Sequence, residues 1–123
     1  MTKEALLVVS HGSRRPQSNA EVVALSKKIK PLTKQKFDLV EAAFLELADP
    51  LIPDGIKRCV EAGVDSVLIL PYFLAAGRHV VEDIPGIVEQ ARQEHPGIEI
   101  RIMNHVGAAT LMPDFLAEIA LAD

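Results

Sequence analysis

The chain has 123 residues, of which 49% are hydrophobic and 24% charged, and its formal net charge is −4. This length fits one domain over residues 1–123 with one buried core, and the ordinary charged fraction argues against disorder. The net negative charge argues against a general nucleic-acid-binding protein. Cys59 is the only cysteine, which excludes a disulfide framework within one chain. No apolar run is long enough for a signal peptide or a membrane span, so we expect a soluble cytoplasmic protein with no membrane partner.

The first predicted element is a strand over residues 5–10. Its continuous, β-branched-rich apolar run is typical of a strand buried on both faces of a parallel sheet. Ser18 and Glu21 then stand at capping-box spacing, which predicts that Ser18 caps a first helix. The apolar side chains of this helix recur at helical intervals, at Val22, Leu25, Ile29 and Leu32.

A second, more mixed strand is predicted over residues 38–46, and Asp49-Pro50 then predicts the cap and first turn of a second helix. Gly63 suits the end of this helix. Its apolar face comprises Ile52, Ile56, Cys59 and Val60, which makes Cys59 a core residue.

Residues 66–71 are another continuous apolar run and predict a third strand. A third helix is expected to begin around Asp83-Ile84-Pro85 and to end before Pro96-Gly97. Residues 98–102 alternate apolar and charged side chains, which places a fourth strand at an edge of the sheet. A fourth helix is predicted over residues 112–122.

This alternation of strands and helices predicts an α/β fold. Its four-stranded parallel sheet has the order 2-1-3-4, with helices on both faces. In such a sheet, ligands bind beyond the carboxyl ends of the strands, near the point where the strand order reverses. Here that point lies between the first and third strands.

Polar side chains follow each predicted strand at this edge. His11 follows the first strand, Glu46 the second, His79 the third and His105 the fourth. Neutral imidazoles and a carboxylate can hold cobalt, nickel, iron or zinc, and they can accept protons near neutral pH. The alternative for each is an ordinary surface or capping residue. His95, at the end of the third helix, is interpreted as a helix C-terminal cap.

Three arginines, Arg14, Arg15 and Arg78, flank the predicted site loops. They either suit a carboxylate-bearing ligand or are ordinary surface charge. The chain contains no Gly-x-Gly-x-x-Gly, no Walker lysine loop and no Gly-x-Ser-x-Gly elbow. His-Gly after the first strand also occurs in phosphohistidine enzymes, but Ser10 stands where that class has an arginine. A phosphotransfer enzyme therefore remains a disfavoured alternative.

Three motifs together resemble the sirohydrochlorin cobaltochelatase family, in its short single-domain form among the class II tetrapyrrole chelatases. The similarity spans essentially the whole chain. The motifs are Ser10-His11-Gly12-Ser13-Arg14, Phe44-Leu45-Glu46 with Pro50 close behind, and Leu70 to Val80 with Asp83-Ile84-Pro85. After the fourth strand, Asn104-His105-Val106-Gly107 departs from the Gly-x-His-Pro-like pattern of many relatives.

The resemblance implies a chelatase-like lyase that inserts a divalent metal, cobalt, into sirohydrochlorin for cobalamin-type biosynthesis. His11 and His79 correspond to the paired active-site histidines, as metal ligands and proton acceptors, and Glu46 to an acidic position beside them. The resemblance further implies that the tetrapyrrole is held by Ser10, Ser13, Arg14 and Arg78. No permanently bound cofactor is expected, because Co²⁺ is a substrate.

Several alternatives stay open. Nickel insertion for coenzyme F430 and ferrous iron insertion for sirohaem would use the same ligands. A non-catalytic metal or tetrapyrrole carrier would use the same site.

We also expect a homodimer, because one small domain cannot enclose a large flat macrocycle alone. The candidate contact is the fourth helix, with Phe115, Leu116, Ile119 and Leu121; the alternative is that this helix covers the sheet.

Overall fold

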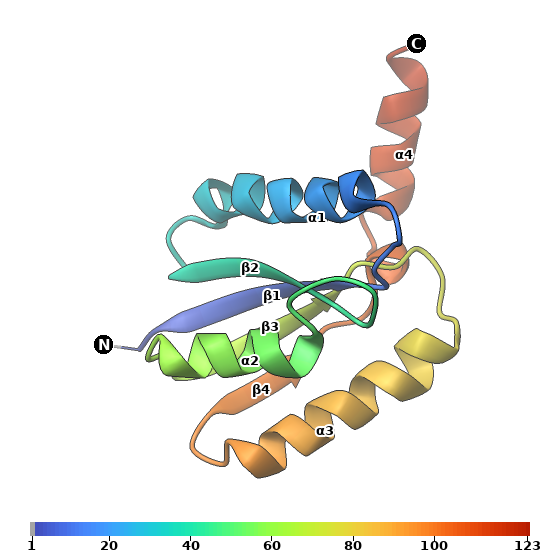
Figure 1. The fold of residues 1–123 in the computed structure, drawn as a ribbon. Coiled ribbons are helices and arrows are strands. Elements are labelled where there is room, and N and C mark those ends of the chain that lie inside the picture. The colour runs from blue at the N-terminus through green and yellow to red at the C-terminus, as the bar shows by residue number, and fades with distance from the viewer. Residues whose placement is uncertain (1) are drawn as a thin grey trace.

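The computed structural model describes residues 2–123, and its centre is one parallel β-sheet (Figure 1). The strands are β1 (Glu4–Ser10), β2 (Leu39–Phe44), β3 (Ser66–Pro71) and β4 (Glu99–Ile102). Their order across the sheet is β2-β1-β3-β4, with every pairing parallel. The predicted fold class, strand order and edge position of the fourth strand are therefore confirmed.

Helices cover both faces of this sheet. Figure 1 shows α1 (Pro16–Ile29) on one face, and α2 (Ile52–Glu61) and α3 (Ile84–Glu94) on the other. Short turns occupy Lys30–Thr33 and Val106–Ala108 as 3₁₀-helix, and His79–Asp83 as π-helix. Within residues 2–123, no helix has the length and apolar character needed to cross a bilayer.

The central strand β1 contributes side chains to two separate core layers, because successive residues of a strand point to opposite faces. Leu6 and Val8 pack on the α1 side, together with Val40 of β2. Leu7 and Val9 pack with residues of α2 and α3, among them Ile56 and Val88. Burial on both faces accounts for the uninterrupted apolar run at the start of the chain.

The first helix begins earlier and ends earlier than its sequence pattern predicted. Its N-cap is Arg15, and Pro16 lies at the first helical position, where its fixed φ suits the helix and its missing N–H costs nothing. Ser18 is therefore inside the helix, and the predicted capping box is wrong. The helix ends at Ile29, so Leu32 falls in the following 3₁₀ turn, where it is 77% exposed.

The second helix, in contrast to the first, begins later than predicted. Leu51 is its N-cap and Pro53 lies in its first turn, so neither Asp49 nor Pro50 serves the predicted role. Pro50 is instead held beside the sheet, where its carbonyl accepts a hydrogen bond from the Phe44 amide at 2.8 Å. The end of the helix is as predicted: Gly63 follows the C-cap with a φ of +90°.

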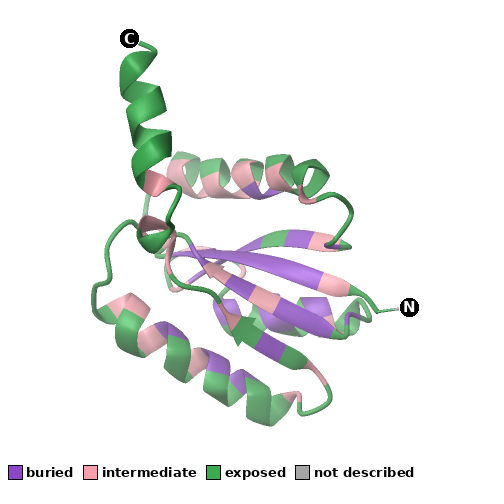
Figure 2. Cartoon of the chain, turned by 180° about the vertical axis from the view of Figure 1, so that it is seen from behind, coloured by how far each residue is buried: buried purple, intermediate pink, exposed green. Residues whose placement is uncertain are grey.

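The fourth helix, α4 (Met112–Leu121), extends away from the sheet (Figure 1). It contains no buried residue, and Figure 2 shows it exposed along almost its whole length. The alternative that this helix covers the sheet is therefore wrong, because α1, α2 and α3 already cover both faces.

Candidate active site

The carboxyl edge of the sheet, where β1, β2 and β3 end, brings three of the predicted site residues together: His11, Glu46 and His79. Backbone pairing continues past the ends of β1 and β2: the Leu45 amide donates to the Ser10 carbonyl at 2.9 Å, and the Glu46 amide to the His11 carbonyl at 3.0 Å. The sheet ladder itself therefore places Glu46 beside His11.

Gly12 permits this close approach of the two loops. Its φ is +95°, and a Cβ atom at this position would lie 1.8 Å from the carbonyl oxygen of Glu46. No side chain fits at that distance, and the positive φ also favours glycine. The His-Gly pair in the first motif thus has a steric reason.

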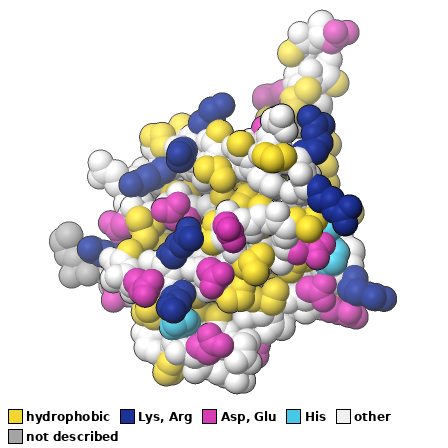
Figure 3. All heavy atoms as spheres, viewed as in Figure 1, with side chains coloured by type: hydrophobic (Ala, Val, Ile, Leu, Met, Phe, Trp, Pro, Cys, Tyr) yellow, Lys and Arg dark blue, Asp and Glu magenta, His cyan; other side chains and the backbone are white. Residues whose placement is uncertain are grey.

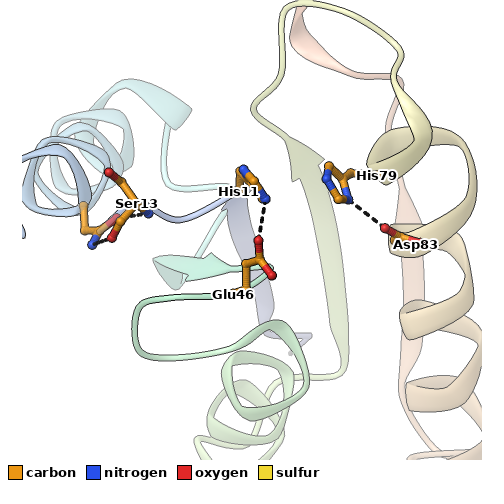
Figure 4. Close-up of polar contacts among 6 residues, drawn as sticks. His11, Ser13, Glu46, His79 and Asp83 are labelled. Atoms are coloured by element: carbon orange, nitrogen blue, oxygen red, sulfur yellow. Dashed lines mark hydrogen bonds and ion pairs between the residues drawn. The ribbon is translucent and has the colours of Figure 1, made fainter. Parts of the chain in front are cut away.

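His11 and His79 lie stacked at this edge, each with its own carboxylate partner (Figure 4). Their ring centroids are 4.7 Å apart and the ring planes meet at 28°. Nε2 of His11 lies 2.9 Å from Oε1 of Glu46, and Nδ1 of His79 lies 2.7 Å from Oδ2 of Asp83. The side chains of both histidines are 45% exposed, so an incoming ligand can reach them.

The sequence predicted a loop at His79, because the third helix was expected to begin only around Asp83. The structure differs at this position. His79 is the first residue of the π-helical turn His79–Asp83, which runs directly into α3. The amides of Val80 and Val81 both donate to the Gly77 carbonyl at 3.1 Å, which fixes the start of this turn. The helical backbone brings residue 83 onto the same side as residue 79.

Asp83 is a site residue that the sequence analysis missed. The sequence pattern placed it at the start of the third helix and within the third motif, but gave it no role in the site. The available signal was the spacing His79-x-x-x-Asp83, since residues four apart on a helix are neighbours. The spacing brings the two side chains together only if the helical backbone begins at residue 79, which is four positions before the predicted start of the third helix.

The other candidate residues are more dispersed. Ser10 is buried at the end of β1. The Ser13 hydroxyl accepts a hydrogen bond from the Arg15 amide at 3.0 Å, which helps to shape the turn before α1. Arg14 is exposed, and Nε of Arg78 lies 3.8 Å from Oε2 of Glu82, with its side chain 81% exposed.

Within residues 2–123, three further residues make no hydrogen bond to the paired histidines. His105 is the N-cap of the turn Val106–Ala108, and no hydrogen bond within residues 2–123 joins its side chain to His11 or His79. His95 is the C-cap residue of α3, as expected. Cys59 is buried, and burial together with the neighbouring Glu41 carboxylate raises the pKa of its thiol to about 11. Its predicted place in the core is confirmed.

The arrangement offers two imidazoles and two carboxylates, but not a finished metal cage. In the described part of the chain, no three His, Cys, Asp or Glu side chains are grouped so that they could hold a metal ion. Each imidazole has one nitrogen facing a carboxylate, which leaves its second nitrogen to bind a metal or accept a proton.

Comparison with known proteins identifies the family. The family model CbiX matches residues 5–121. The chain belongs to the CbiX family. A CbiX protein of cobalamin (vitamin B12) biosynthesis from Marinobacter aquaeolei has a similar structure, with a TM-score of 0.78 and 25% identity over 97% of this chain and 95% of that one. The sirohydrochlorin chelatase SirB from Bacillus subtilis, in complex with cobalt, gives a TM-score of 0.85 at 27% identity; the match covers 98% of this chain and 51% of that one.

Relatives of this CbiX-family chain have names that specify different metals. A sirohydrochlorin cobaltochelatase from Methanococcus maripaludis is 42% identical over 69% of this chain, and a chloroplastic sirohydrochlorin ferrochelatase from Arabidopsis thaliana is 37% identical over 90%. The chain spans 58% and 48% of the lengths of these two proteins. A sirohydrochlorin cobaltochelatase from Sulfolobus acidocaldarius is 32% identical, with 94% of this chain and 88% of that protein covered.

Proposed function

We propose that this protein is a sirohydrochlorin chelatase that inserts a divalent metal, Co²⁺, into sirohydrochlorin during cobalamin-type biosynthesis. The observation that supports this most is the stacked pair His11 and His79, 4.7 Å apart at the edge of the sheet where α/β proteins bind ligands. Family membership and the names of the relatives point to the same chemistry.

Metal insertion has three requirements that these side chains can meet. Water must leave the ion, the ion must pass to the macrocycle, and two pyrrole protons must be accepted. The second nitrogens of His11 and His79 replace water on the ion and then accept protons, since neutral imidazole performs both roles. Glu46, at 2.9 Å from His11, assists as a further ligand or as a proton acceptor.

Binding of the acid-decorated macrocycle requires local cations, because the net charge of the chain is −4. We assign this role to Arg14 and Arg78, both exposed next to the histidine-bearing segments, and give Ser10 and Ser13 supporting roles as polar contacts. On the face drawn in Figure 3, Lys and Arg side chains are scattered rather than gathered in one patch.

The metal is tested by mixing the protein with sirohydrochlorin and Co²⁺, Ni²⁺ or Fe²⁺ in separate anaerobic reactions and following the absorbance change. We expect the highest kcat/KM with Co²⁺. Faster insertion of Fe²⁺ would assign the protein to sirohaem synthesis, in keeping with the relatives named ferrochelatase, and faster insertion of Ni²⁺ to coenzyme F430. Imidazole ligands accept all three ions.

The same experiment separates an enzyme from a carrier. A chelatase converts many equivalents of sirohydrochlorin per protein chain, whereas a carrier stops after one. A reaction that ends at one equivalent, with excess metal and substrate present, would contradict the proposed activity.

We also propose that the protein acts as a homodimer. The histidine pair is open to one side, and a large planar substrate needs a wall on each face to be enclosed. The projecting α4 offers the contact surface: Phe115, Leu116 and Ile119 are 55–56% exposed. Figure 3 shows hydrophobic side chains along this helix.

A further inference from the structure

The two site histidines contact their carboxylates through different ring nitrogens. Glu46 faces Nε2 of His11, whereas Asp83 faces Nδ1 of His79. An ionised carboxylate can only accept hydrogen bonds, so the nitrogen that it contacts is the one that holds the proton of a neutral imidazole. Contacts of this kind favour opposite tautomers in the two rings.

Opposite tautomers leave different lone pairs available. In His11 the lone pair is on Nδ1, close to the backbone, and in His79 it is on Nε2, at the far end of the ring. Figure 4 shows His79 between His11 and Asp83, so Asp83 lies on the side of His79 away from His11. Of the two nitrogens that do not face a carboxylate, Nδ1 of His11 and Nε2 of His79, the one further from its own backbone is Nε2 of His79.

The position of Asp83 is fixed by the backbone rather than by its own side chain. Asp83 is the last residue of the π-helical turn that begins at His79. The next residue, Ile84, is fully buried in the core, and its amide donates to the His79 carbonyl. Ile84 thus holds the end of the turn through its buried side chain and the start of the turn through its hydrogen bond to His79. The pair His79–Asp83 is fixed in position as a result.

We propose that Asp83 is a positioning residue that holds His79 in the Nδ1–H tautomer and so directs the Nε2 lone pair at the incoming metal. Glu46 imposes the opposite tautomer on His11, and His79 is accordingly the ring whose outer nitrogen receives the ion. The effect on metal insertion rests on the proposed function; the tautomer itself does not. Loss of a carboxylate that orients a ligating histidine typically lowers metal affinity or activity 10- to 100-fold.

The test uses nuclear magnetic resonance of the full chain labelled with ¹⁵N at histidine, since ring-nitrogen shifts distinguish the two tautomers. Asp83→Ala removes the partner and Asp83→Glu keeps a carboxylate within reach. Glu82→Gln is the matched control, because it removes one negative charge from the adjacent residue, which faces Arg78 rather than His79. Affinity for Co²⁺ and the rate of metal insertion are measured on the same samples.

We expect His79 to be protonated on Nδ1 in the parent protein and in Glu82→Gln. In Asp83→Ala we expect a mixture of tautomers, with Co²⁺ affinity and kcat lowered about 10- to 100-fold. The Asp83→Glu variant should regain the parent tautomer and part of the rate.

An Nε2–H tautomer of His79 in the parent would overturn the proposal without recourse to any variant. So would an Asp83→Ala variant with the parent tautomer and the parent affinity for Co²⁺. A parent protein that shows the expected tautomer but inserts no metal would instead overturn the proposed function and leave the tautomer assignment standing.

Discussion

At the scale of single residues, His11 and His79 are distinguished from His95 and His105 by their contacts. Each ring of the pair lies against a carboxylate and against the other ring. His95 ends α3, at the far end of that helix from the paired rings. Within residues 2–123, His95 therefore provides a comparison in the same chain: a half-buried histidine that is not hydrogen-bonded to either ring of the pair.

Replacing His79 with alanine should abolish most metal insertion and leave the fold intact. The side chain is 45% exposed, so its removal creates little cavity, whereas it supplies one of two imidazoles. Loss of a general base or ligand of this kind lowers a rate about 100- to 10,000-fold. The initial rate of sirohydrochlorin metallation measures the effect, and His95→Ala, the control, should keep the parent rate. A His79→Ala protein that inserts metal at the parent rate would refute the assignment.

Cys59 should make the stability of the protein depend on pH in the alkaline range. The pKa of its thiol is about 11 in the folded protein, against an ordinary value of 9.0. Below pH 9 both folded and unfolded chains keep the proton. Between pH 9 and 11 only the unfolded chain loses it, so the free energy of unfolding falls by about 1.4 kcal/mol per pH unit from this group.

Urea unfolding at pH 8 and pH 10 measures this effect. The parent should lose more stability between the two pH values than Cys59→Ala, which lacks the titrating group although it is less stable at both. Equal losses in the two proteins would show that the thiol does not titrate on unfolding in this range.

At the scale of elements, the sequence predicted apolar strands better than it predicted helix starts. A strand such as Leu6–Val9 forms where the chain is buried on both faces of the sheet, and its continuous apolar sequence indicates that burial directly. Helix starts depend on competition between nearby caps. In the first helix the start is at Pro16, so the predicted cap Ser18 lies inside the helix. In the second helix Pro53 lies in the first turn, so the predicted cap Asp49 lies before the actual N-cap. The carboxylate partner of His79 was missed for the same reason, since its identification depends on a helix that starts at residue 79.

The loop after β1 should tolerate no side chain at Gly12. Gly12→Ala should lower the free energy of unfolding by about 1–3 kcal/mol through its positive φ, with a further loss because the new Cβ atom meets the Glu46 carbonyl oxygen at 1.8 Å. That clash also displaces Glu46 from His11, so we expect slower metal insertion.

Gly63→Ala is the matched control for this effect. Gly63 has a similar φ of +90°, but nothing lies within 4 Å of its would-be Cβ atom. Urea unfolding and the metallation rate should both distinguish the variants: Gly63→Ala shows only the backbone cost and full activity. Identical behaviour of the two proteins would mean that the contact with Glu46 is unimportant.

At the scale of the whole molecule, the sheet and its strand order followed from the alternation of predicted strands and helices. The placement of α4 did not. Its apolar side chains predict burial, but within residues 2–123 they have no surface to bury against, because both faces of the sheet are already covered. Sequence periodicity identifies the face of a helix that is buried, not the chain that it is buried against.

The parent protein should sediment as a dimer at micromolar concentration, with about twice the mass of the 13.4 kDa chain. The double variant Leu116→Asp, Ile119→Asp should sediment as a monomer, because it places charges in the apolar contact. Leu32→Asp, at an exposed position outside α4, should stay dimeric. A parent monomer that still converts sirohydrochlorin would rule out the dimer as the active form.

The parallel pairing of β1 with β3 also determines when the site comes into existence. Glu4 pairs with Ser66 and Val9 with Pro71, so the two histidine-bearing segments meet only after more than half of the chain has been synthesised. Contacts between such distant segments form late, since the loop between them must close first. A partly folded or partly translated chain therefore presents isolated imidazoles with little hold on a metal ion. Capture of a metal ion by both rings together, as the proposed function requires, therefore becomes possible only after these two segments have paired.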